Sequence, residues 1–130
     1  MNELAADRPT VGWLVILFAV TGGLLAQAAM PAGLSWMKGA AAAFFTDRDW
    51  ELLDETLKEA LDAAADGDAR EWSNEKSGAS GRVTPLASES RDDITCRRVR
   101  IENLAKGSSS SYRYLFCRRG DGPWGIGQPK

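Results

Sequence analysis

The sequence predicts an α+β protein: an N-terminal hydrophobic helix, then one amphipathic helix packed on a small antiparallel sheet of four or five strands. Residues 11–29 are apolar and uncharged, residues 46–64 repeat apolar side chains at helical spacing, and from residue 70 the repeat changes to the period of two typical of strands. A chain of 130 residues has room for one such domain. The expected organisation is a signal peptide or membrane anchor at 1–34, a connector at 35–45, an α+β domain at 46–127 and a tail at 128–130.

The N-terminal stretch Val11 to Ala29 indicates a membrane or an export route. No charge occurs between Arg8 and Lys38, and roughly 19 residues of helix span about 28 Å, close to the apolar thickness of a bilayer. Two interpretations remain open. A signal peptide would break at Gly22-Gly23 and be cleaved at Ala26-Gln27-Ala28, whereas an uncleaved anchor would use the whole stretch. Because acids outnumber bases ahead of the stretch, we favour the anchor.

Charge is divided unevenly along the chain, and histidine is absent. Residues 1–75 carry a formal charge of −8 and residues 76–130 carry +6. Such asymmetry can mark an anionic partner, but attraction between the two halves of one domain is the simpler explanation. Without histidine, the commonest general base and metal ligand is missing. We therefore expect no enzyme activity, no catalytic residue, no metal site and no cofactor.

The amphipathic helix has a clear start and a proposed end. Thr46 can cap it and Asp49 stands at the capping-box position, while Gly67 is expected to end it. Its apolar stripe consists of Trp50, Leu53, Leu57, Leu61 and Ala64. Its acidic face is interpreted as solvated.

The strands are expected at 70–73, 82–86, 94–103, 111–119 and 124–126, separated by turns rich in glycine, serine and aspartate. Pro85 donates no backbone hydrogen bond and so marks a strand edge or end. In 94–103, Thr95, Arg97, Val99 and Ile101 share one face. The predicted core consists of Trp50, Leu53, Leu57, Trp72, Val83, Val99, Leu115 and Trp124.

The only two cysteines, Cys96 and Cys117, lie on the two strands of a predicted hairpin that turns at 105–110. An even cysteine count behind an export segment favours a disulfide in an oxidising compartment, with two buried free thiols as the alternative. Alternation places Cys96 on a charged face and Cys117 with Leu115, so a bulge or a shift in pairing is possible and the register stays open.

Arginines in these strands, with tyrosines between them, form a candidate anionic-ligand site. The candidate residues are Arg97, Arg98, Arg100, Arg113, Arg118 and Arg119. An exported protein would meet lipopolysaccharide, phospholipid or an acidic glycan rather than nucleic acid. We favour the simpler interpretation, in which the arginines solubilise the sheet and pair with the acidic helix.

Several short motifs, in this order and spacing, resemble the surface-antigen domain of proteobacterial envelope proteins, which is similar to the rickettsial outer-membrane surface antigen. The motifs are residues 72–74 and 77–81, Val83-Thr84-Pro85-Leu86, Cys96-Arg97, Cys117-Arg118, and Asp121-Gly122 followed by Trp124. The resemblance covers Phe45 to Ile126. It implies a small helix-plus-sheet domain in the cell envelope, without known catalytic activity.

The sequence therefore predicts a non-enzymatic bacterial envelope protein with a structural or surface role. Its domain would lie on the periplasmic or extracellular side of a membrane contacted by Val11 to Ala29. The alternative is an envelope binding module that uses the arginine-rich strands. The ligand, the protein partners, the oligomeric state and the choice between inner and outer membrane stay undetermined.

Overall fold

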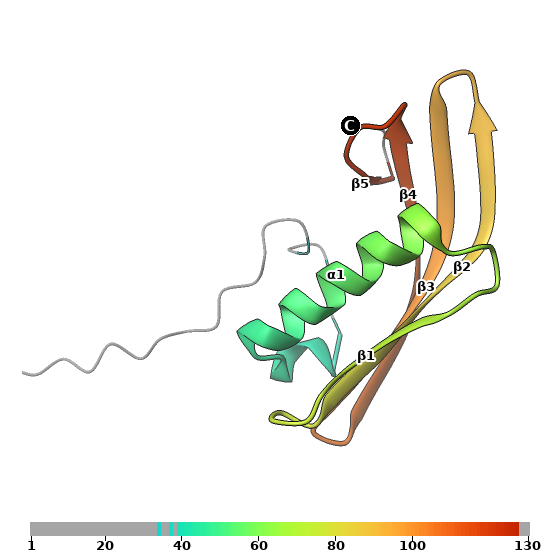
Figure 1. Cartoon of the computed structure of the whole chain (residues 1–130). Helices are drawn as coiled ribbons and strands as arrows, with labels where there is room; N and C mark the ends of the chain where they lie inside the picture. The colour runs from blue at the N-terminus through green and yellow to red at the C-terminus, as the bar shows by residue number, and fades with distance from the viewer. Residues whose placement is uncertain (1–33, 35–36, 38, 128–130) are drawn as a thin grey trace, which may run out of the picture.

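One helix lies across one face of a five-stranded antiparallel sheet in the computed structural model, which describes residues 34, 37 and 39–127 (Figure 1). The elements are a short 3₁₀ helix η2 (Ala42–Phe44), α1 (Asp47–Ala63), β1 (Arg70–Asn74), β2 (Ala79–Arg91), β3 (Ile94–Ala105), β4 (Ser108–Arg119) and β5 (Gly125–Ile126). The strands pair in chain order as a meander, so every connection is a short turn. The predicted α+β class and the antiparallel sheet are confirmed.

The predicted N-terminal hydrophobic helix and its cleavage site lie outside the described residues. Within the described part of the chain, no helix is both long enough and apolar enough to cross a membrane.

The start of α1 follows the predicted capping box. The Thr46 hydroxyl accepts a hydrogen bond from the Asp49 backbone N–H (3.3 Å), and the Asp49 carboxylate accepts one from the Thr46 N–H (2.8 Å). Asp49 also receives hydrogen bonds of 2.7 Å from Asn74 and from Ser77, which tie the helix start to the β1–β2 turn. Burial of Asp49 raises the pKa of its carboxyl group, but these hydrogen bonds outweigh burial and leave the pKa below its ordinary value.

The end of α1 lies earlier than the sequence predicted. The helix ends at Ala63, and the predicted terminator Gly67 lies in the turn that follows. Gly67 has a φ of 89°, and its N–H donates a 2.6 Å hydrogen bond to the carbonyl of Pro85 on β2. Gly67 therefore joins the turn to β2. The end of the helix is capped instead by the side chain of Arg97.

The core lies between α1 and the sheet. Six of the eight predicted core residues are buried, namely Trp50, Leu53, Leu57, Trp72, Val83 and Val99. Leu115 was predicted wrongly, because it lies on the face of β4 that points away from α1 and is 38% exposed. Its neighbour Phe116 occupies the core position, and Trp124 is partly buried against the core. Residues ahead of the helix also enter the core, including Leu34, Met37, Ala41 and Phe45.

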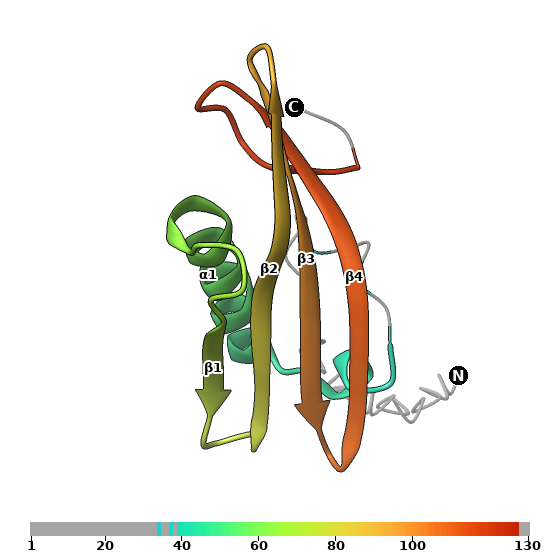
Figure 2. The same cartoon turned by 90° about the vertical axis from the view of Figure 1, so that its right-hand side faces the viewer.

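A bulge in β2 shifts its pairing with β3 between Pro85 and Ala87. β1 pairs with β2 only as far as Val83, so Pro85 lies where β2 has no neighbour on its β1 side. The Pro85 carbonyl bonds Gly67 on that side, which places the missing N–H away from β3. Past the bulge, β2 and β3 continue beyond the end of α1 as a long hairpin (Figure 2).

Candidate functional site

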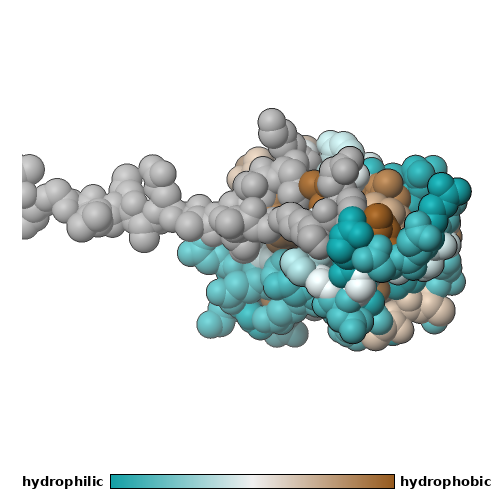
Figure 3. Space-filling model, turned by 90° about the horizontal axis from the view of Figure 1, so that it is seen from above, coloured by the Kyte–Doolittle hydropathy of each residue, from teal (hydrophilic) through white to brown (hydrophobic). Residues whose placement is uncertain are grey.

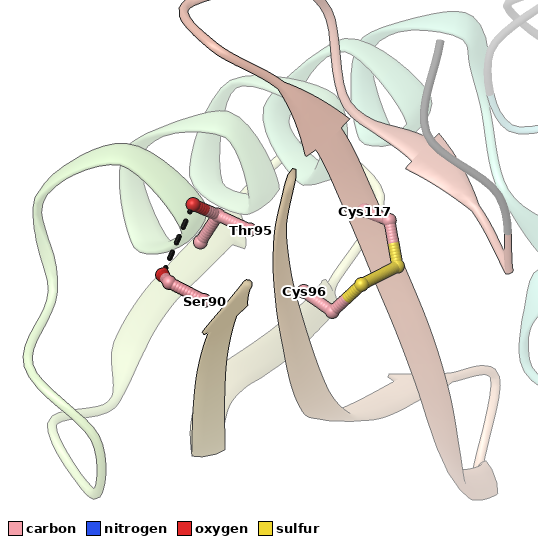
Figure 4. Close-up of a disulfide and its surroundings, with 4 residues drawn as sticks. All are labelled: Ser90, Thr95, Cys96 and Cys117. Carbon is pink, nitrogen blue, oxygen red and sulfur yellow. Dashed lines mark hydrogen bonds between the residues drawn. A yellow bond between two sulfur atoms is a disulfide. The ribbon is translucent and has the colours of Figure 1, made fainter. Parts of the chain in front are cut away.

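The two cysteines form a disulfide that joins β3 to β4 (Figure 4). Cys96 and Cys117 are direct cross-strand partners, with a Cα–Cα distance of 4.1 Å. That distance is close to the spacing of a non-hydrogen-bonded antiparallel pair. Pairing between β3 and β4 is continuous, so the register needs no bulge, and both cysteines share the sheet face opposite α1. The structure thus contains a disulfide instead of two free thiols.

Alternation divides the six candidate arginines between the two faces of the sheet. Arg97 and Arg118 lie on the face that α1 covers, whereas the other four lie on the outer face. These four are Arg98, Arg100, Arg113 and Arg119. The structure therefore does not bring the six together in one site.

Arg97 lies in the core, where its guanidinium group caps the end of α1. Its Nη1 donates to the carbonyls of Ala60 and Leu61, both at 2.9 Å, and its Nη2 donates to the carbonyl of Ala64 at 2.7 Å. Leu61 and Ala64 are among the residues whose carbonyls the end of an α-helix leaves without backbone partners, while the Ala60 carbonyl also accepts the Ala64 N–H at 3.2 Å. A cation at this end also complements the helix dipole. Arg97 therefore caps the C-terminal end of α1, which Gly67 was expected to terminate.

Two side chains complete the contacts of Arg97. Its Nε donates to the Ser88 hydroxyl at 2.8 Å, and its Nη2 donates to the Asp66 carboxylate at 2.9 Å. Hydrogen bonds from Arg97, then from Ser88, lower the pKa of Asp66 below its ordinary value. Since every N–H of the guanidinium group now has an acceptor and the residue is buried, Arg97 has no donor left for a ligand.

Arg118 joins α1 to the segment that leads into β5. Its Nη1 lies 3.2 Å from the Asp62 carboxylate, and its guanidinium carbon lies 4.5 Å from the centre of the Trp124 ring. The Trp124 indole N–H donates to the same Asp62 oxygen at 2.8 Å. These groups form one side of a cleft of about 520 Å³ that Leu57, Leu61 and Phe116 also line.

The remaining candidate arginines lie on the outer face. Arg119 forms an ion pair with Asp93 in which both carboxylate oxygens accept, at 2.9 and 3.0 Å. Arg100 and Arg113 stand directly opposite each other on β3 and β4, and Arg98 is two residues from Arg100 on the same face. Arg100 has Glu102 at 3.9 Å, whereas Arg98 and Arg113 have no ion-pair partner among the described residues. We call Arg98, Arg100 and Arg113 the outer-face arginine cluster.

Comparison with known proteins identifies the family of this chain. The family model described as 17 kDa outer membrane surface antigen matches residues 59–125, from the end of α1 to β5. The chain belongs to this surface antigen family. No curated protein and no solved structure matched the chain.

The family match covers the disulfide, Arg97 with its carbonyl acceptors, and the outer-face arginine cluster. Surface antigens of this description are not an enzyme family, and they suggest a place in the cell envelope. The disulfide is consistent with an exported surface antigen domain, because disulfides persist in oxidising compartments.

No group of three or more histidine, cysteine, aspartate or glutamate side chains that could hold a metal occurs within the described ranges. The carboxylates with shifted pKa values, Asp49 and Asp66, both hold α1 in place through the hydrogen bonds given above. Seen from the end that carries the β2–β3 turn, the described surface is mostly hydrophilic, with smaller apolar areas (Figure 3).

Proposed function

We propose that this chain is a structural or surface component of the bacterial cell envelope, with its α+β domain on the periplasmic or extracellular side of a membrane. The Cys96–Cys117 disulfide carries the proposal, because the cytoplasm keeps such pairs reduced. Family membership supports an envelope location. The membrane partner in this proposal is the stretch Val11 to Ala29, acting as a signal peptide or an anchor. We expect no catalytic activity and no nucleic-acid partner.

The test is a topology experiment in cells. A phosphatase reporter that is active only after export is fused after Lys130, and the matched control lacks residues 11–29. We expect activity from the first fusion and none from the second. Activity from a reporter that works only in the cytoplasm would contradict the proposal. The intact mass of the native protein then shows whether cleavage occurs after Ala28 and whether both thiol hydrogens are lost.

A second candidate function is recognition of an anionic envelope component, such as lipopolysaccharide, phospholipid or an acidic glycan. The observation that favours it is the cross-strand pair Arg100–Arg113, with Arg98 beside it. Like charges placed directly opposite each other destabilise a sheet, and a bound anion would relieve that repulsion. The simpler alternative is that these arginines only keep the sheet soluble.

A binding assay with charge-matched variants separates these two explanations. Phosphatidylglycerol vesicles are compared with phosphatidylcholine vesicles, and lipopolysaccharide is tested in parallel. Arg98→Glu with Arg113→Glu should abolish a salt-sensitive interaction, whereas Arg91→Glu with Lys106→Glu makes the same change in net charge away from the cluster. An equal loss of binding in both double variants would show that net charge alone causes the interaction, and it would contradict a defined site.

A further inference from the structure

Most of β4 is a sheet edge. β4 pairs along its whole length with β3, but β5 pairs with it only at Phe116 and Cys117. Residues 108–115 therefore have no strand beside them on the other side within the described part of the chain, and Figure 2 shows β4 as the outermost strand there. An edge of this kind presents backbone N–H and C=O groups that another strand can bond.

The outward-facing groups can be identified from one hydrogen bond. The Gly127 N–H donates to the Leu115 carbonyl at 2.7 Å, so the backbone groups of Leu115 point away from β3. In an antiparallel ladder this direction alternates, which assigns the same outward direction to Arg113, Ser111 and Ser109. All three residues are exposed, and no described residue hydrogen-bonds their outward groups. Among the described residues, the part of the edge without a backbone partner therefore runs from Ser109 to Arg113.

This edge lacks four of the features that can block strand addition, namely proline, lysine, a bulge and a short strand. Natural sheets protect their edges with proline, lysine, bulges or short strands. Residues 108–115 contain neither proline nor lysine, and their pairing with β3 has no bulge. By contrast, β1 at the opposite side is only five residues long, and β2 has Pro85 and a bulge where its neighbour ends.

The charge beside the edge indicates which strand would fit. Arg113 points to the outer face, stands opposite Arg100, and has no ion-pair partner among the described residues. A strand added to β4 would place a side chain about 5 Å from Arg113 on that face, where a carboxylate would be favourable. A second copy of this chain, paired by the same edge, would bring a second Arg113 to the same face. Charge therefore favours an acidic partner over self-association.

We infer that the β4 edge from Ser109 to Arg113 binds an extended acidic segment of another protein, which adds a sixth strand to the sheet. Backbone hydrogen bonds from the outward groups would supply the affinity, and Arg113 would select carboxylates at alternate positions of the segment. The inference goes beyond the proposed envelope role. It also differs from the anionic-ligand candidate, because it requires the backbone of the edge and only one arginine of the cluster.

The test uses hydrogen exchange on the full-length, disulfide-bonded protein with synthetic peptides. The probe is an eight-residue peptide that alternates threonine and glutamate, and the controls are a threonine–lysine peptide and the acidic peptide N-methylated at alternate residues. The acidic peptide should slow amide exchange at Ser109, Ser111 and Arg113. It should leave Tyr112 unchanged, because alternation points that amide toward β3. Neither control peptide should do this.

Variants separate strand addition from charge attraction. Ser111→Pro removes one outward N–H without disturbing the hydrogen bonds between β4 and β3, and should weaken the binding of the acidic peptide about tenfold. Ser111→Ala keeps this N–H and should leave the binding unchanged. Ser109→Pro repeats the test at a second position, in case the first proline disturbs the strand. Arg113→Glu should reverse the preference toward the lysine peptide. Equal binding of the acidic and N-methylated peptides would overturn strand addition, and protection that grows with protein concentration alone would instead identify a second copy as the occupant.

Discussion

The Nη2 of Arg97 donates a 2.7 Å hydrogen bond to the carbonyl oxygen of Ala64, the residue that follows the last turn of α1. A side chain from the middle of the sheet thereby completes the end of a helix more than thirty positions earlier in the chain. The helix has no glycine cap, and the guanidinium group donates to the Leu61 carbonyl, which such a cap would otherwise satisfy. This contact fastens the end of the helix to the sheet.

Arg97→Met should destabilise the domain strongly. The substitution keeps much of the apolar volume but leaves the buried carbonyls of Leu61 and Ala64 without a donor, at a cost of about 3 kcal/mol. The Ala60 carbonyl keeps the Ala64 N–H as its donor. Urea unfolding of the oxidised protein measures the change. The matched control is Arg98→Met, next to it but exposed on the outer face, which should change stability by less than about 0.5 kcal/mol. Equal losses in the two variants would contradict the capping role.

Reduction of the disulfide should lower stability without changing the fold. Cys96 and Cys117 are separated by 21 positions, and opening a loop of this size costs about 3 kcal/mol in the chain-entropy description. The urea midpoint with and without reductant gives the difference. In the Cys96→Ala and Cys117→Ala double variant the reductant should have no effect, so a shift there would point to an unrelated action of the reagent.

Gly81→Ala should destabilise the sheet although Gly81 is neither in a turn nor at positive φ. Gly81 lies between its strand partners Trp72 and Asn103, and the Trp72 indole packs directly on it. An added methyl group would overlap the indole and would lie 2.9 Å from the Asn103 amide oxygen. We expect a loss of about 2 kcal/mol in urea unfolding. Ser80→Ala, the preceding residue on the opposite face, should be nearly neutral, and a similar loss there would remove the packing explanation.

Stability should fall in acid through Asp49 and Asp66. Both carboxylates have a pKa below the ordinary value in the folded protein, so the unfolded chain binds their protons more readily. Their stabilisation is complete above the unfolded-state pKa, about 3.9, and is lost as the pH falls through the lower folded-state pKa. Asp49→Asn should reduce stability at pH 7 and flatten the dependence between about pH 4 and pH 2. Urea midpoints across that range measure it, and an unchanged slope would show that other groups control acid unfolding.

Local patterns predicted the parts of the fold that depend on neighbouring residues. The Thr46–Asp49 capping box, the apolar stripe of α1 and the face shared by Arg97, Val99 and Ile101 were all readable, because cap geometry and alternation are set within a few positions. The cysteine pair followed from composition and the predicted hairpin. These features needed no information about which face the helix would cover.

Features that depend on the packing of distant elements were not readable in this way. Alternation in β4 separates Leu115 from Phe116 but does not say which face meets α1, so the exposed Leu115 was predicted to be in the core. Arg97 looked like one of six equivalent cations, and its burial became visible only with α1 placed over it. One signal was available: Arg97 alternates with Val99 and Ile101, and an arginine on an apolar face needs buried acceptors.

The helix α1 is fastened at both ends, through Asp49 to Asn74 and Ser77 at its start and through Arg97 at its end. Neither end can fray alone without abandoning buried polar groups, so detachment of the helix would require the sheet to come apart as well. The domain should therefore behave as a single cooperative block. A protease would then find no partly opened form to cut, and cleavage would depend on the rare events in which the whole domain unfolds.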